Sequence, residues 1–203
     1  AAIFASSLEK LQQKKLYGYL VHHFEFYQSH PQLWEKMKDL KAEGKIDKIG
    51  FSLYNTDQLQ YLLDNEVVFD VLQFPYNLFD RQFDTYLLYL KQCGVEIHTR
   101  SVFLQGLFFK NVRKLTDKLL PMKKYLEKLH EYCGISGISM EQLALNYVVS
   151  HPNIDGVLIG VDNCQQLQAN VDALQNGLRQ EDIDFISSIN VSEKELLNPV
   201  NWK

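Results

Sequence analysis

The sequence of 203 residues has little cysteine, and its three cysteines, Cys93, Cys133 and Cys164, lie far apart without a C-x-x-C pair. An odd number of scattered cysteines argues against a disulfide framework and against a structural zinc site. We therefore expect reduced thiols in a cytoplasmic protein and no metal. No apolar run approaches the roughly 18 residues of a membrane span, so no membrane partner is expected.

Charge of one sign is also lacking. The chain carries 21 Lys and Arg against 25 Asp and Glu, for a formal net charge of −4. A protein that binds nucleic acid usually presents a strongly basic face. The balance of charges here gives no sign of such a face, so nucleic acid is not expected as a partner. No Pro-, Gly- or Ser-rich linker and no charge run interrupts the chain, which predicts one domain over residues 1–203.

Several sequence motifs are absent as well. No G-x-G-x-x-G follows an apolar run, and there is no P-loop, no H-E-x-x-H and no G-x-S-x-G. What the sequence has instead is alternation of short apolar runs with helical patterns. The expected strands are Leu16–His22, Ile46–Ser52, Phe69–Phe74, Val95–Arg100 and Gly156–Ile159. The expected helices are Ile3–Leu16, Gln32–Glu43, Thr56–Asn65 capped by Thr56, Phe83–Cys93, Leu119–Tyr132, Ser139–Ser150, Asn163–Leu174 and Glu181–Ile189.

Five strand–helix repeats are typical of an α/β fold with parallel strands joined by right-handed crossovers. The strands should be neighbours in chain order, with helices outside. Two architectures remain open at this point, an open doubly wound sheet and most of a (β/α)8 barrel. A complete barrel takes about 250 residues, so the chain has room for a partial barrel of about five βα units.

Polar residues stand where each expected strand ends. In parallel α/β folds the carboxyl ends of the strands form the ligand-binding face, so these residues are the candidate site. In chain order they are His22, Ser52, Gln73, Arg100 with Ser101, and Gly160, followed in the next helix by Gln166 and Asn170.

The motifs around these positions occur in a specific order. They are YLVH ending at His22, GKIDKIGFS ending at Ser52, QFPYN starting at Gln73, RS at Arg100 followed by QG, and HPNID with LIG and QLQAN near the end. This succession resembles the aldo-keto reductase family over nearly the whole chain. The resemblance implies a (β/α)8 barrel that binds a nicotinamide cofactor, NAD or NADP, in extended form across its C-terminal face.

The resemblance also implies a reaction. Such oxidoreductases reduce a small carbonyl substrate to an alcohol with hydride from the nicotinamide, while a tyrosine tuned by a lysine and an aspartate delivers the proton. The chain matches the last five of the eight βα units in the family's barrel. The family's aspartate, tyrosine and lysine lie on the first three units. We therefore expect this chain to be the C-terminal part of such a barrel and to be inactive alone.

The roles carry over residue by residue. His22 matches the catalytic histidine that orients the substrate oxygen, and Ser52 and Gln73 match the groups that bind the nicotinamide carboxamide. Leu53 stands where the family usually has an asparagine, with Asn55 nearby. Arg100 replaces an aromatic ring that stacks on the nicotinamide; it could stack there or pair a substrate carboxylate or phosphate.

The remaining matches concern the cofactor's other end. Ser101 and Gly160 belong to cofactor-binding motifs, and Gln166 and Asn170 match the adenosine-side amides. Asp162 stands where the family often has a cation against the 2′-phosphate of NADP. A carboxylate repels that phosphate and accepts a hydrogen bond from a ribose hydroxyl, which favours NAD.

Two other functions stay open. The chain could be a non-catalytic barrel remnant or a regulatory subunit that binds a nucleotide or a protein. A different α/β enzyme, such as a phosphosugar isomerase, would need a glycine-rich phosphate loop that residues 100–106 do not supply. The substrate pocket could be walled by aromatic residues of the irregular segments 103–116 and 191–203, namely Phe103, Phe108, Phe109 and Trp202.

Overall fold

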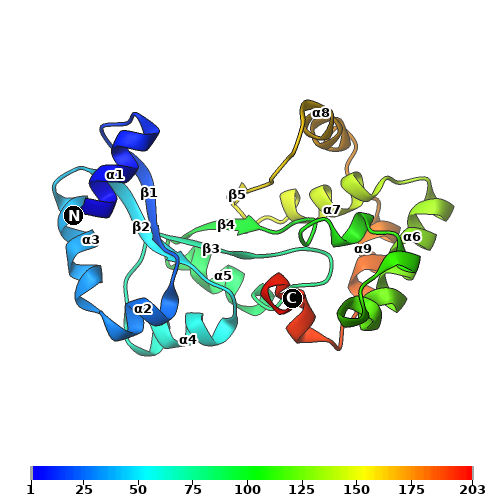
Figure 1. The fold of residues 1–203 in the computed structure, drawn as a ribbon, viewed down its shortest axis with the longest axis horizontal. Helices are drawn as coiled ribbons and strands as arrows, with labels where there is room; N and C mark the ends of the chain where they lie inside the picture. The colour runs from blue at the N-terminus through cyan, green and yellow to red at the C-terminus, as the bar shows by residue number, and fades with distance from the viewer. Residues whose placement is uncertain (1, 203) are drawn as a thin grey trace. The chain divides into compact units, whose positions relative to one another are not determined.

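A computed structural model describes residues 2–202 and contains a five-stranded sheet with the strand order β1-β2-β3-β4-β5. Figure 1 shows the elements along the chain. The strands are β1 Leu16–Val21, β2 Ile46–Ser52, β3 Val71–Pro75, β4 Glu96–Arg100 and β5 Gly156–Val157. The helices are α1 Ala2–Leu11, α2 Phe24–Ser29, α3 Gln32–Ala42, α4 Thr56–Asp64, α5 Asp84–Gln92, α6 Lys123–Ser136, α7 Met140–Val149, α8 Cys164–Ala173 and α9 Gln180–Ser188.

The strands run parallel. Leu16 pairs with Ile46 at one end of β1 and Val21 pairs with Phe51 at the other, while the end of β2 pairs in the same direction with β3. Backbone bonds from Glu96 to Asp70 and from Tyr76 to Arg100 carry this direction on to β4. The predicted order of parallel neighbours is confirmed, and with it the α/β class.

Some predicted boundaries were wrong for local reasons. α1 ends at Leu11, because Gln12 takes a positive φ of 52° and Leu16 already donates its amide to Lys45 in the sheet. The cap of α4 is Asn55, whose side chain accepts from the Gln58 amide, and Thr56 is the first helical residue.

Other differences lie at short elements. The short helix α2 was not predicted, and Pro121 lies in a 3-10 turn, Asp117–Met122, that precedes α6. No helix within residues 2–202 has the length and apolar character needed to cross a membrane.

The contacts divide the chain into two compact units. The first runs up to Phe74 and includes Tyr86–His98, and the second holds Pro75–Thr85 and the chain from Thr99 onward. Phe51 of β2 is the centre of an aromatic cluster in the first unit, fully buried and stacked on Trp34 of α3 at 4.5 Å between ring centroids. Tyr27 of α2 meets the same ring edge-on at 4.9 Å. This cluster fixes α2 and α3 against β2.

The second unit has its own core. The rings of Tyr132 on α6 and Phe185 on α9 stack at 3.8 Å. The Arg81 guanidinium donates to the carbonyls of Ile186, at 3.1 Å, and Ile189, which ties the segment after β3 to the end of α9. Gln142 and Asn146 of α7 donate to carbonyls around the end of α8. These bonds hold α7 and α8 together.

Candidate functional site

Three predicted site residues lie at the ends of strands in the first unit. Ser52 pairs directly with Gln73 in the register of β2 and β3. His22 follows Val21, whose partner is Phe51, so it comes level with Ser52. The Ser52 side chain is buried, and its Oγ donates to Gln73 Oε1 at 3.4 Å. The sheet therefore brings His22, Ser52 and Gln73 to one edge, as the sequence predicts.

The surroundings of His22 hold a residue that the sequence analysis missed. The His22 ring is exposed and lies 6.0 Å from the ring of Tyr54 and 5.2 Å from that of His23, between centroids. Tyr54 comes two residues after the end of β2, beyond the strand ends at which the candidate residues were expected. A phenol and an imidazole at one sheet edge are both groups that can exchange protons.

The position after Ser52 is also settled by geometry. The Leu53 side chain is fully buried, and the Asn55 side-chain oxygen is bound to the Gln58 amide as the cap of α4, at 3.0 Å. Neither side chain is available where the family's asparagine would contact a carboxamide. Ser52 and Gln73 are left as the polar pair at this edge.

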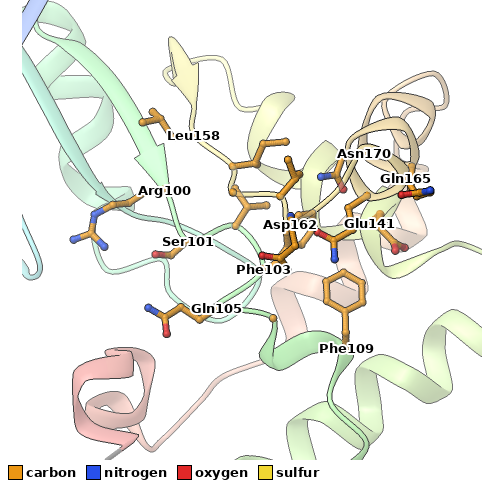
Figure 2. A pocket seen from close by; sticks show the side chains of 17 residues that line it. Arg100, Ser101, Phe103, Gln105, Phe109, Glu141, Leu158, Asp162, Gln165 and Asn170 are labelled. Carbon is orange, nitrogen blue, oxygen red and sulfur yellow. Dashed lines mark hydrogen bonds between the residues drawn. The ribbon is translucent and has the colours of Figure 1, made fainter. Parts of the chain in front are cut away.

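A cavity of about 950 Å³ lies within the second unit. Six of the nine predicted site residues line it, namely Arg100, Ser101, Gly160, Asp162, Gln166 and Asn170. Figure 2 shows Arg100 and Ser101 on one side and Gln165 and Asn170 on the other. Phe103 and Phe109 line it too, whereas Phe108 is fully buried and Trp202 donates its ring N–H to Leu196. The lining residues Glu141 and Gln165 were not predicted.

The loop before α8 is held by side-chain caps. Asn163 accepts from the Gln166 amide at 2.8 Å, and Gln166 Oε1 accepts from the Asp162 amide at 2.7 Å. The oxygen of Gln166 is therefore used inside the protein, which leaves its NH2 group for a ligand. The Asp162 carboxylate stays exposed at the positive end of the α8 dipole, where a negative charge is stabilised.

Asn170 has unmet hydrogen-bonding capacity. Its residue is only 5% exposed, it lines the cavity, and its side chain makes no hydrogen bond to any residue of the described chain. Its amide atoms are not among the fully buried polar atoms that lack a partner, so the amide is open to the cavity and accessible to a polar ligand. Of the residues that line the cavity, Arg100 is the only cation, against the two carboxylates of Glu141 and Asp162.

The loop after β3 supports the other side of the cavity. Asn77 is fully buried, accepts from the amides of Phe79 and Asp80, and donates to the Ser101 carbonyl at 3.1 Å. Ser101 needs this support because its φ is +62°, a conformation that L-residues rarely adopt. Burial raises the pKa of the Asp80 carboxyl to about 6, against hydrogen bonds from Gln82 that lower it.

A tyrosine and a lysine do meet in the first unit, but at the opposite ends of the strands from His22. Tyr17 donates its hydroxyl to Glu96 at 2.6 Å, and Lys48 pairs with the same carboxylate. Burial favours the neutral form of Glu96, yet the hydrogen bonds from Lys48, Tyr17 and His98 outweigh it and lower the Glu96 pKa to about 2. In this cluster the tyrosine hydroxyl is engaged in a hydrogen bond and the lysine in an ion pair, both with Glu96.

The match to known proteins decides the family. Residues 1–191 match the Aldo/keto reductase family. The chain belongs to that family. It is 25% identical over 201 residues to the NADH-specific methylglyoxal reductase of Escherichia coli, covering 88% of this chain and 60% of that protein. It is 27% identical to the L-galactose dehydrogenase of Arabidopsis thaliana, over 80% of this chain and 54% of that one.

This aldo-keto reductase chain is also similar to proteins of known structure. The apo form of an aldo-keto reductase from Bacillus halodurans superposes with a TM-score of 0.73 at 20% identity, covering 95% of this chain and 69% of the other. At 20% sequence identity, this structural similarity shows that the two proteins share a fold and shows nothing more. The chain thus spans only about 54–60% of the first two curated relatives.

Proposed function

We propose that this chain is the C-terminal part, about five βα units in a single domain over residues 1–203, of a (β/α)8 barrel that reduces a small carbonyl compound with NADH or NADPH. The observation that carries the proposal is the cavity of the second unit, which gathers six residues that match cofactor-binding positions of the family. The similarity to a methylglyoxal reductase favours a small aldehyde as substrate. A cytoplasmic enzyme remains the expectation from its three unpaired cysteines.

The residues of the cavity fit the adenosine end of a dinucleotide. The unpartnered Asn170 amide supplies both a donor and an acceptor, Asp162 supplies an acceptor for ribose hydroxyls, and the Phe109 ring is half-exposed. The loop that starts at Gly160 leads into the N-terminus of α8, whose free N–H groups favour anions. When bound, the cofactor supplies the hydride, and the residues of the cavity bind the cofactor and orient it.

The first unit supplies the groups for the reacting end. Ser52 and Gln73 present a hydroxyl and an amide side by side, which matches the donor and acceptor of a carboxamide. Holding a carboxamide fixes which ring face is presented. His22 at the same edge is exposed and so accessible to a carbonyl oxygen. We propose these roles for His22, Ser52 and Gln73, and a stacking or anion-pairing role for Arg100.

The charges of the cavity favour NAD over NADP. The 2′-phosphate of NADP would need a cation near the ribose, and Asp162 offers a carboxylate there. The α8 residues that line the cavity, Gln165, Gln166, Ala169 and Asn170, carry no charge. A carboxylate that accepts from a ribose hydroxyl forms a charge-assisted hydrogen bond. We therefore propose that NADH binds at least as tightly as NADPH.

The Asp162→Arg variant tests this proposal. It should shift the ratio of dissociation constants toward NADPH by about fivefold, because a partly exposed charge pair contributes roughly 1 kcal/mol. The measurement is the dissociation constant of each cofactor at fixed salt. Asp172→Arg is the matched control, since Asp172 is exposed on the same helix and does not line the cavity. A strong wild-type preference for NADPH that Asp162→Ala leaves unchanged would show that this carboxylate does not face the ribose.

A further inference from the structure

We propose that Glu141 and Asn170 together select a 6-aminopurine over a 6-oxopurine at the end of the cavity between α7 and α8. The inference rests on the proposed function, since it assigns the base-reading groups of the same cofactor site. Glu141 is not among the site residues predicted from the sequence, and it comes from a different helix than the other polar residues at this end of the cavity.

The two side chains face one cavity from two fixed helices. Ser139 caps α7 by accepting from the Gln142 amide at 3.0 Å, which places Glu141 in the first turn. Asn146 of α7 donates to Ala173, the last residue of α8, at 2.7 Å. Figure 2 shows Glu141 and Asn170 on the same side of the cavity, with the Phe109 ring nearby. The rigid α7–α8 pair therefore sets the separation of the carboxylate and the amide.

Both groups have unmet hydrogen-bonding capacity. Within residues 2–202, the Glu141 carboxylate makes no hydrogen bond or ion pair, and the side chain of Asn170 makes no hydrogen bond. Asn170 as a residue is only 5% exposed, but its amide atoms are not among the fully buried ones without a partner, so they are open to the cavity. A carboxylate only accepts, whereas an amide both donates and accepts. This end of the cavity therefore offers a ligand two or more hydrogen-bond acceptors, from Glu141 and Asn170, and one donor group, the Asn170 NH2. An aromatic ring lies beside them.

A 6-aminopurine matches this set. Its exocyclic amine donates two hydrogens, which the Glu141 carboxylate and the Asn170 oxygen accept, and its ring nitrogens accept from the Asn170 NH2 group. A 6-oxopurine places a carbonyl oxygen at the position of the amine, where it would face the carboxylate without a hydrogen between them. Sites built around a buried hydrogen bond reject analogues that lack it. Phe103 and Phe109, 5.3 Å apart between centroids, offer apolar surface to the ring.

A purely structural role for Glu141 has a different signature. An acidic residue in the first turn of a helix stabilises that helix through its dipole, so removing it would lower stability. It would then change the binding of both purines equally. The ratio of the two dissociation constants is moved by base reading and not by helix stability.

The experiment compares NADH with its reduced hypoxanthine counterpart, which differs only at position 6 and position 1 of the base. Dissociation constants for both are measured by titration calorimetry on the wild-type chain, on Glu141→Ala and on Glu131→Ala. Glu131 is exposed on α6 and does not line the cavity, so it is the matched control. The wild type should bind NADH at least about tenfold more tightly, because hydrogen bonds to a charged group are the stronger ones.

The variants then separate the possible outcomes. Glu141→Ala should bring the ratio of the two dissociation constants close to one by weakening NADH binding. Glu141→Gln should retain part of the preference for NADH, and Glu131→Ala should keep the wild-type ratio. A wild-type ratio near one, or a ratio that Glu141→Ala leaves unchanged, overturns the assignment while the dinucleotide site stands. Failure of both dinucleotides to bind the wild type overturns the proposed function itself. Thermal unfolding of each variant verifies that Glu141→Ala is folded, and Glu141→Gln carries the test if it is not.

Discussion

Residues 1–203, purified alone, should not reduce a small aldehyde with NADH at a useful rate. Reduction of a carbonyl needs a proton at the developing alkoxide, and loss of a general acid typically costs about 10²–10⁴-fold in rate. Tyr17 and Lys48 cannot supply it beside His22, since both are bound to Glu96 near the start of the strands. With the roles proposed above, the chain would bind a cofactor and orient a carbonyl oxygen without completing the reaction.

The assay follows NADH absorbance with a full-length reductase of the family as a positive control. Tyr54→Phe is measured in parallel, because the Tyr54 ring lies next to that of His22. Turnover by the wild-type chain would contradict the expectation, and its loss in Tyr54→Phe would make Tyr54 the proton donor. Cofactor binding without turnover is also expected if the protein is a regulatory, nucleotide-binding barrel. Carbonyl reduction by a longer protein that contains this chain would favour the reductase over that alternative.

Gly50→Ala should destabilise the chain by more than about 3 kcal/mol, at or beyond the upper end of overpacking effects. An alanine Cβ at this position would lie 1.7 Å from the Val71 carbonyl oxygen and 2.7 Å from its carbon. Both atoms are backbone of the neighbouring strand, so relief requires β2 and β3 to separate. Since domains are stable by only about 5–15 kcal/mol, the variant should be largely unfolded or show a sharply lowered denaturant midpoint.

Gly18→Ala is the matched control in the same sheet. Its Cβ would approach nothing more closely than the Lys48 carbonyl oxygen at 4.0 Å, an ordinary contact. Chemical denaturation of the two variants beside the wild type measures the difference. Equal stability of Gly50→Ala and Gly18→Ala would show that β2 and β3 do not approach as closely as described, and the register of Ser52 with Gln73 would then be in question.

The strands with buried faces could be predicted well from the sequence. Ile46–Ser52 was predicted to the residue, because its run is bounded by Gly44, which takes the positive φ that follows α3, and by Ser52 and the Asn55 cap of α4. The last strand was predicted to reach Ile159 but ends at Val157. It is the edge of the sheet, where Leu158 and Ile159 remain substantially exposed, so their apolar character did not indicate strand structure.

The site was predictable where it follows strand ends. The rule that neighbouring parallel strands end at one edge brought Ser52 and Gln73 together, as the register of β2 and β3 shows. It could not locate Tyr54, which lies beyond a strand end, or Glu141, which lies in the first turn of α7. Acidic residues are common in first turns for reasons of helix stability, so only the cavity distinguishes Glu141 from an ordinary helix residue.

The central claim is that the cavity of the second unit holds the adenosine part of a nicotinamide dinucleotide. A crystal structure of the chain with saturating NADH tests it most directly. We expect electron density for adenosine in this cavity, with a ribose hydroxyl within hydrogen-bonding distance of the Asp162 carboxylate and the base against Asn170. Density for the cofactor at another place, or a cavity without density at saturating NADH, would contradict it.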